Sequence, residues 1–252
     1  MIKVTACSEK GRRTENQDNF LIDKITKGDQ TDSFSYVGTL DQTDQKVFLV
    51  CDGMGGEAYG QEASRMAVEY LEAVLKNRQK PLEAIELARQ LRRLNQKISR
   101  FYELHMAKGG TTFSALLLSP DGIADVINLG DSPIFKIGKE GISLLSEMQS
   151  LAGLKLKNGM ITKEDYEKGN EKNILVAYLG DSSGISIDKI FYTRVKYEKG
   201  DRFLLMSDGL LEVMQPETIE QKVQEGSTAE DLVKEGLERQ AADNITVVSL
   251  EV

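Results

Sequence analysis

Short apolar runs divide the chain into strands toward both ends, with two long helices between them. Strands are predicted where apolar positions alternate or run together between turn residues, at 2–8, 19–23, 34–39, 46–51, 112–118, 123–129, 133–137, 142–145, 190–196, 202–207 and 245–251. Apolar residues spaced three and four apart predict helices over roughly 58–77 and 81–106. Short helices are predicted over about 210–239, whereas residues 146–183 have no clean period and are predicted to be irregular.

Clusters of strands around a central pair of helices are typical of an α+β fold with mainly antiparallel sheets, because parallel βαβ units would alternate strand and helix throughout. With 252 residues, 40% of them hydrophobic, the chain can bury one full core. It has only four prolines and no low-complexity tract that would mark a linker. We therefore expect residues 1–252 to form a single domain.

Composition limits where the protein works and what it binds. The N-terminal stretch lacks the apolar core of a signal peptide, and no apolar run approaches the ~20 residues of a membrane span. Cys7 and Cys51 lie in apolar, strand-like surroundings, as expected of buried thiols in a reducing compartment. A net charge of −8 argues against nucleic acid as the main partner. We expect a cytoplasmic protein with no membrane and no nucleic-acid partner.

Five aspartates stand where strand-like runs begin or end. Asp52, Asp131 and Asp208 close apolar runs, Asp243 precedes the last run, and Asp18 comes directly before NFLID. Carboxylates gathered at strand ends repel one another unless a cation lies between them. Their hard oxygen atoms suit Mg²⁺ or Mn²⁺ far better than zinc or copper. The sequence therefore predicts a site for Mn²⁺ or Mg²⁺.

The sequence lacks the residues and motifs that several other catalytic mechanisms need. The single histidine, His105, falls at the end of an apolar helix stripe, which indicates a helix position and neither a metal ligand nor a catalytic base. No GxxxxGKS or GxxxxGKT phosphate loop is present, and no DxDxT nucleophile motif, since Asp52 is followed by Gly-Met-Gly. Carboxylates, serine, threonine and arginine remain as the chemically useful groups.

Six short motifs in a fixed order carry a family resemblance over nearly the whole chain. They are RTENQD (13–18), DGMGG (52–56), GGTT (109–112), GDS (130–132), SDGLLE (207–212) and DNIT (243–246). In these motifs the chain resembles the bacterial form of the metal-dependent serine/threonine protein phosphatases of type 2C, the PPM family. The resemblance implies a four-layer αββα sandwich of two mainly antiparallel sheets flanked by helix pairs.

The resemblance also implies a centre with two tightly bound metal ions. Asp52 would bridge both ions, and the backbone carbonyl of Gly53 would bind the second. Asp208 and Asp243 would complete the ligands of the first ion, and Asp18 would act through metal-bound waters. A hydroxide bridging the two Mn²⁺ or Mg²⁺ ions would then attack phosphorus directly, without a covalent intermediate.

Further residues are implied around that centre. Arg13 would hold the substrate phosphate, because a planar guanidinium suits bidentate phosphate contact. Asp131 and Glu212 would hold a third, weaker metal ion, while residues 111–112 and Asn244 would support the ligands. The predicted catalytic residues are Arg13, Asp52 and Asp208.

The resemblance names the reaction class and leaves two alternatives open. The implied substrates are phosphoserine and phosphothreonine in proteins, with a cognate serine/threonine kinase as a partner and a monomer as the working state. A regulator with a phosphatase fold and a phosphatase for small phosphorylated molecules are the alternatives. The presence of Asp52, Asp208 and Asp243 favours an enzyme over a regulator that has lost its metal ligands.

The chain departs from the family pattern at several places. Gln17 stands where animal relatives carry a glutamate that binds the second metal, and GDS is followed by Pro133 instead of the usual arginine. Met54 stands where some relatives have a histidine, as in many bacterial members. Residues 146–183 align with the mobile flap of the family, but they lack the DHS motif and carry GNEKN in place of HPxRN. The flap changes bear on which substrates are selected more than on the chemistry.

Overall fold

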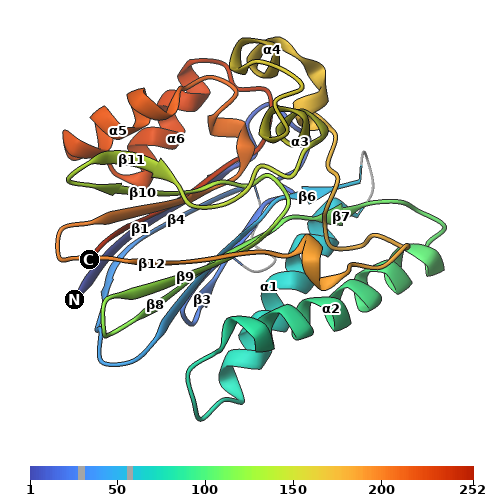
Figure 1. The fold of residues 1–252 in the computed structure, drawn as a ribbon, viewed down its shortest axis with the longest axis horizontal. Helices are drawn as coiled ribbons and strands as arrows, with labels where there is room; N and C mark the ends of the chain where they lie inside the picture. The colour runs from blue at the N-terminus through green and yellow to red at the C-terminus, as the bar shows by residue number, and fades with distance from the viewer. Residues whose placement is uncertain (28–31, 56–58) are drawn as a thin grey trace.

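The computed structural model describes residues 1–27, 32–55 and 59–252, and within them two six-stranded sheets lie face to face. Helices cover both outer faces, so four layers follow one another as helix, sheet, sheet and helix (Figure 1). Pairing between neighbouring strands is antiparallel in both sheets. The predicted α+β sandwich is therefore confirmed.

The first sheet has the order β11-β10-β13-β14-β1-β4. Its strands are β1 (Ile2–Glu9), β4 (Ser33–Leu40), β10 (Ile134–Gly138), β11 (Gly141–Leu144), β13 (Arg202–Met206) and β14 (Ile245–Glu251). The second sheet has the order β12-β9-β8-β5-β2-β3. Its strands are β2 (Asn19–Ile22), β3 (Ile25–Thr26), β5 (Lys46–Cys51), β8 (Phe113–Ser119), β9 (Ile123–Leu129) and β12 (Phe191–Lys196).

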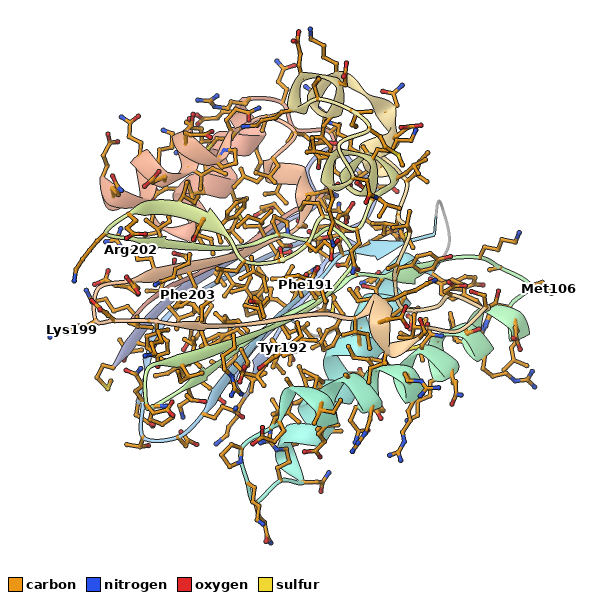
Figure 2. The ribbon with its side chains drawn as sticks, viewed as in Figure 1. Met106, Phe191, Tyr192, Lys199, Arg202 and Phe203 are labelled. Atoms are coloured by element: carbon orange, nitrogen blue, oxygen red, sulfur yellow. The ribbon has the colours of Figure 1, made fainter. Side chains whose placement is uncertain are left out.

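Alternation along the strands separates the core into layers. In β5, Phe48 and Val50 face the opposite sheet, whereas Leu49 and Cys51 face the helices. The space between the sheets is filled by large apolar side chains such as Phe203 (Figure 2). Both faces of the central strands are thus buried, which explains why β5 reads as a continuous apolar run and not as an alternating one.

Two long helices cover the second sheet. They are α1 (Gly60–Lys76) and α2 (Ala84–Leu104), close to the predicted ranges, although residue 58 of the first prediction lies outside the described residues. The predicted second helix began too early, because the chain at Pro81 is still a loop and Glu83 is the N-cap. His105 follows the end of α2 and is exposed, which confirms its reading as a helix-end residue.

The helices on the first sheet are α5 (Pro216–Gln224) and α6 (Ala229–Glu238), as predicted. They bury Leu232, Val233 and Val223 against β1, β13 and β14. No helix of the described residues is long and apolar enough to cross a membrane.

The irregular structure predicted for residues 146–183 is wrong in part. The segment contains two short helices, α3 (Leu151–Lys157) and α4 (Lys163–Lys168), and the single-turn helix η1 (Asn170–Asn173). Helices this short never complete the apolar period that a pattern search needs. Their N-caps were the readable signal: Thr162 and Asp165 form a capping box at α4.

Candidate active site

The predicted acidic residues meet at one end of the sandwich. Asp52 follows β5, Asp208 opens the single-turn helix η3 (Asp208–Leu210) after β13, and Asp243 comes just before β14. A cleft of about 590 Å³ lies there, lined by the flap residues 173 and 175 and by the N-terminal loop. It includes seven of the eight predicted residues, namely Arg13, Asp52, Gly53, Asp131, Asp208, Glu212 and Asp243.

Asp18 is the eighth residue and lies behind the cleft, 1% exposed. Its Oδ2 accepts a 2.7 Å hydrogen bond from Oγ of Ser207, and its backbone N–H donates to Oδ1 of Asn16 at 3.1 Å. Its Oδ1 has no hydrogen-bond partner among the described residues. A buried carboxylate oxygen without a partner is costly, and a metal ion or a metal-bound water is the kind of partner that would satisfy it.

A closed ring of buried polar groups fixes Asp18 between the sheets. The Ser207 hydroxyl accepts from the backbone N–H of Thr246 at 2.9 Å, and the Thr246 and Ser8 hydroxyls lie 2.7 Å apart. Ser8 in turn accepts from Nδ2 of Asn16 at 2.9 Å, which closes the ring back to Asp18. Sequence reasoning missed this ring, because its members lie in four separate segments of the chain. Only their position beside predicted ligands could have suggested it.

Asp52 is held through its backbone, so its carboxylate is left for other partners. The N–H of Asp52 donates to Oγ1 of Thr112 at 2.8 Å, and the hydroxyl of Thr111 donates to the Asp52 carbonyl at 2.9 Å. Thr112 is braced by the hydroxyl of Ser132 at 2.7 Å. The supporting role predicted for residues 111–112 is consistent with these contacts.

Gly53 occupies a place where no other residue would fit. It lies in the two-stranded ribbon of β6 (Gly53–Met54) and β7 (Gly110–Thr111) beside Asp52. A Cβ atom at this position would lie 2.2 Å from the backbone oxygen of Gly60 and 2.5 Å from that of Gln17. The close approach of three backbone segments therefore requires glycine and brings the Gly53 backbone to the floor of the cleft.

Asn244 organises the loop that carries Arg13. Its side-chain oxygen accepts from the backbone N–H of Gln17 at 2.8 Å, and its Nδ2 donates to the carbonyls of Lys10 and Glu15 at 2.8 and 3.0 Å. Three contacts from one amide pin both ends of the loop. The side chain predicted as a supporting residue thus holds the loop, and both its oxygen and its nitrogen are used in doing so.

Arg13 lies at the mouth of the cleft and pairs with one of the predicted metal ligands. Its guanidinium is 2.7 Å from Oδ2 of Asp243, and its side chain is 57% exposed. Glu212 lies nearby and accepts from the backbone N–H of Ala242 at 3.1 Å. Both side chains therefore touch the segment that enters β14.

Burial and mutual repulsion make these carboxylates hard to ionise. Burial, followed by the neighbouring aspartates, raises the pKa values of Asp52 and Asp208 well above the ordinary range. Burial also raises the pKa of Asp131 to about 7 and that of Asp18 to about 6. Perturbed carboxyl groups that converge on one cleft mark it as the functional site.

The cleft fits a hard divalent cation by the chemistry of its donors. No three acidic, histidine or cysteine side chains within the described ranges form a ready-made ion cage. Carboxylates without a cation repel one another, and Asp243 and Asp18 are instead paired with Arg13 and Ser207. The all-oxygen donors and the unpartnered oxygen of Asp18 are the observations that fit Mg²⁺ or Mn²⁺.

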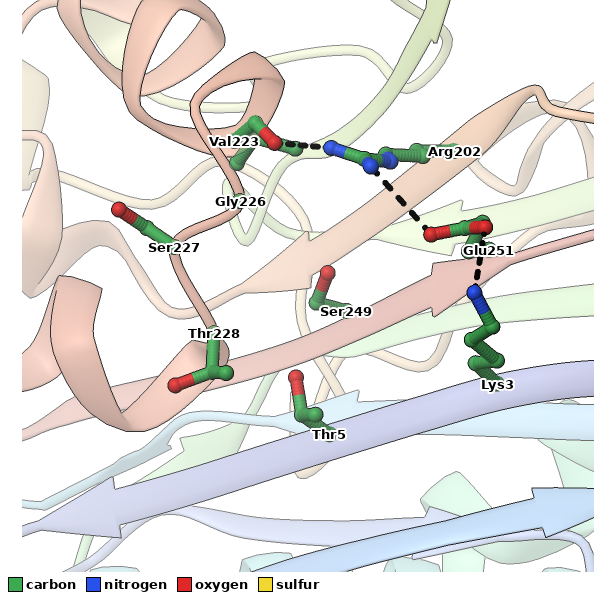
Figure 3. A pocket seen from close by; sticks show the side chains of 9 residues that line it. All are labelled: Lys3, Thr5, Arg202, Val223, Gly226, Ser227, Thr228, Ser249 and Glu251. Carbon is green, nitrogen blue, oxygen red and sulfur yellow. Dashed lines mark hydrogen bonds and ion pairs between the residues drawn. The ribbon is translucent and has the colours of Figure 1, made fainter.

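A smaller pocket lies on the outer face of the first sheet, away from these residues (Figure 3). It has a volume of about 180 Å³. Its two cations, Lys3 and Arg202, both pair with Glu251 at 2.9 and 3.3 Å. The charges compensate one another, and none of the predicted site residues is present, so we assign the site to the acidic cleft.

Known proteins resemble this chain over most of its length. The family described as protein phosphatase 2C matches residues 29–244. The serine/threonine phosphatase Stp of Listeria monocytogenes is 30% identical over 217 residues, which cover 82% of this chain and 84% of that relative. The protein phosphatase PhpP of Streptococcus pneumoniae is 31% identical over 256 residues, which cover 98% and 96%.

A solved structure has the same fold. The catalytic domain of the serine/threonine protein phosphatase PstP, in complex with two manganese ions, superposes with a TM-score of 0.76 at 23% identity and covers 100% of this chain and 99% of that one. The chain belongs to the protein phosphatase 2C family. The family recognised from the six motifs, the fold class and the enzyme class of serine/threonine protein phosphatase are thereby confirmed.

Proposed function

We propose that this protein removes phosphate from phosphoserine and phosphothreonine residues of other proteins, with two divalent cations bound in the acidic cleft. The observation that carries the proposal is the meeting of Asp52, Asp208 and Asp243 in one cleft of a family member. A regulator without catalysis would not need to keep these buried carboxylates, whose ionisation burial and repulsion oppose.

The cations would be held by the floor of the cleft. Asp52, Asp208, Asp243 and the carbonyl of Gly53 would be direct ligands, and Asp18 would reach them from behind through water. When bound, two such ions lower the pKa of water and neutralise phosphoryl oxygens. PstP is similar in fold and binds two manganese ions, which supports Mn²⁺ here, with Mg²⁺ as the other candidate.

A third, weaker ion is proposed beside the first two. Asp131 and Glu212 lie on the same side of the cleft, where it continues toward the flap. Asp131 is buried, whereas Glu212 is exposed. One buried and one exposed ligand would make this third site more open than the two-ion site at the floor of the cleft, and its ion would bind more weakly.

Arg13 would change partners when the cations bind. Its guanidinium now pairs with Asp243, which is itself a proposed ligand. A divalent ion would compete for the same carboxylate, and the exposed arginine would then be released toward the mouth of the cleft. There it can hold two phosphate oxygens in the bidentate manner of a guanidinium and keep the phosphorus in line for attack.

The surroundings of the cleft favour a protein substrate over a small molecule. A second cavity of about 610 Å³ shares Asp131, Asn173, Asp208 and Glu212 with the cleft. It extends between the flap and the body, and its apolar lining is made by Phe135, Leu144, Met148, Leu156, Phe191, Leu211 and Pro216. A small phosphorylated metabolite would leave this apolar surface unused, whereas a polypeptide flanking the phosphate would cover it.

The remaining expectations belong to the same proposal. Residues 1–252 would act as one phosphatase domain, and residues 146–183 would be its substrate-facing flap. The partner would be a serine/threonine kinase that phosphorylates the same proteins, in the cytoplasm, and the enzyme would work as a monomer.

A hydrolysis experiment on matched peptides tests the proposal. One peptide sequence carrying phosphoserine, phosphothreonine or phosphotyrosine would be assayed in chelator and in Mn²⁺, beside a small aryl phosphate. We expect no turnover in chelator, turnover of the first two peptides in Mn²⁺, and loss of turnover in Asp208→Asn. Asp121→Asn, a matched change at an exposed turn, should keep full activity. Full turnover in chelator would refute the two-ion site, and hydrolysis of phosphometabolites without peptides would favour the small-molecule alternative.

A further inference from the structure

Lys27 is a buried lysine that the chemistry described so far does not use. It follows β3 in the hairpin formed with β2, and it is 2% exposed. Lysine is almost never buried without a partner, because its ammonium group is strongly hydrated in water. Lys46, 5% exposed, is the other lysine in this burial class within the described residues.

The hairpin turns Lys27 back onto the predicted metal ligand Asp18. The ammonium group of Lys27 donates to the backbone carbonyl of Asp18 at 2.6 Å, and the Lys27 N–H donates to the carbonyl of Phe20 at 3.3 Å. The carboxylate of Asp18 is held separately, by the hydroxyl of Ser207. Lys27 therefore brings a positive charge to the rear of the acidic cleft without occupying the carboxylate itself.

Asp18 is the carboxylate that depends on this charge. Burial lowers the pKa of Lys27 to about 8, and three acidic groups, Asp18, Asp32 and Glu9, oppose that shift and favour the charged ammonium group. Asp32 already has an ion pair with Lys10 at 2.6 Å, and Glu9 accepts from Ser33 on the exposed side. Asp18 has no ion pair of its own among the described residues, and one of its oxygens has no partner. The buried pair Asp18 and Lys27 is thus mutually compensating.

We propose that Lys27 is a built-in counter-cation of the metal centre, a positioning residue that acts through Asp18. Its charge stabilises the folded protein when no divalent ion is bound, because it offsets the carboxylate of Asp18. The same charge repels a divalent ion in the cleft, so Lys27 weakens metal binding and keeps the ions exchangeable. This inference rests on the proposed binding of divalent ions by the cleft.

Thermal unfolding and Mn²⁺ titration of three variants test the inference. Lys27→Met removes the charge and keeps the length of the side chain, and Lys27→Arg keeps the charge. Lys46→Met is the matched control, since Lys46 is also buried but pairs with Asp41 and Asp44 away from the cleft. Stability would be measured in chelator and in saturating Mn²⁺, and the dissociation constant for Mn²⁺ by calorimetry.

The expected result is a metal-dependent effect at one lysine only. Lys27→Met should lower the Tm in chelator by about 5 °C more than in Mn²⁺, and should tighten Mn²⁺ binding about tenfold, the scale of a full charge held several ångström from the ion. Lys27→Arg should bind Mn²⁺ as the unsubstituted protein does. Lys46→Met should lose equal stability in both conditions. Unchanged or weaker Mn²⁺ binding by Lys27→Met would overturn the inference.

A metal-free comparison covers the case in which Lys27→Met does not fold in chelator. The double variant Asp18→Asn/Lys27→Met carries neither charge, so it should be more stable in chelator than Lys27→Met alone. A double variant no more stable than the single one would overturn the pairing of charges. If the unsubstituted protein bound no Mn²⁺ at all, the proposed function would fail, while this comparison would still decide whether Lys27 balances Asp18.

Discussion

The metal-free protein should gain stability when Asp131 is replaced by asparagine. Asp131 is 5% exposed, and burial together with the charge of Asp243 raises its pKa to about 7. The backbone of its turn is held independently, because Gly130 donates to Oε1 of Gln149 at 2.8 Å and accepts from the Gln149 N–H at 3.1 Å. Asp131→Asn should therefore remove a charge while leaving the turn in place.

The sign and size of the effect follow from the pKa of Asp131. In the unfolded chain an aspartate has a pKa of about 3.9, so between about pH 4 and 7 the folded state binds more protons than the unfolded state. Stability in chelator must then fall as the pH rises through this window. At about 1.4 kcal/mol per pKa unit, the full cost above pH 7 is at most about 4 kcal/mol. Asparagine does not carry this cost, so the variant should be more stable than the unsubstituted protein at pH 8, and the difference should vanish near pH 4.

Urea denaturation in chelator at pH 4.5 and pH 8 measures the difference. At pH 8 the variant should unfold at a higher urea concentration with an unchanged slope, and its Tm should be higher by about 10 °C. The surface change Asp121→Asn should show no such dependence on pH. A stability difference between Asp131→Asn and the unsubstituted protein that is equal at both pH values, or a loss at pH 8, would refute the reasoning.

Further changes test the remaining parts of the site. Arg13→Ala should lower kcat/KM about 10- to 1,000-fold in steady-state assays. Its Mn²⁺ affinity should stay equal or rise, because Arg13 no longer competes with the ion for Asp243. A large loss of Mn²⁺ binding would contradict this. Asp52→Asn should reduce turnover of an aryl phosphate by orders of magnitude. Near-normal turnover with Mn²⁺ bound would refute the role of Asp52 as a metal ligand needed for catalysis. Leu156→Ser changes the lining of the second cavity, between the flap and the body. It should lower kcat/KM for a phosphopeptide about tenfold and leave kcat/KM for the aryl phosphate unchanged. Equal losses on both substrates would exclude this cavity from substrate binding.

The gathering of the acidic residues could be predicted because each is tied to the end of a strand. Strand direction and the turn after it are local properties, and the sequence shows them at Asp52 and Asp208. Antiparallel pairing then places the end of one strand beside the start of its neighbour, which brings Asp208 after β13 next to Asp243 before β14, and Asp52 after β5 next to Asp18 before β2. The metal-binding and phosphate-binding roles of these residues are predictions, which the substitutions at Arg13, Asp52 and Asp208 test.

The partners of Asp18 could not be predicted, because they depend on contacts between distant segments. Ser207 is 189 positions away, and its hydroxyl reaches Asp18 only once the two sheets pack. Lys27 reads as an ordinary surface lysine after a turn, since nothing local marks an ammonium group for burial. Helices α3 and α4 were missed for a different reason, because their six or seven residues are shorter than two helical turns.

The chain supplies fewer cationic side chains than carboxylates to the cleft. Arg13 pairs with Asp243 at the mouth, and the ammonium group of Lys27 donates to the backbone carbonyl of Asp18 at the rear. Asp52, Asp131 and Asp208 form no ion pair within the described part of the chain, and their pKa values are raised largely by burial and then by neighbouring aspartates. An excess of buried carboxylates over cations is unfavourable at neutral pH unless protons or metal ions enter. Divalent ions and protons must therefore compete for this cleft, and metal binding should weaken steadily as the pH falls below about 7.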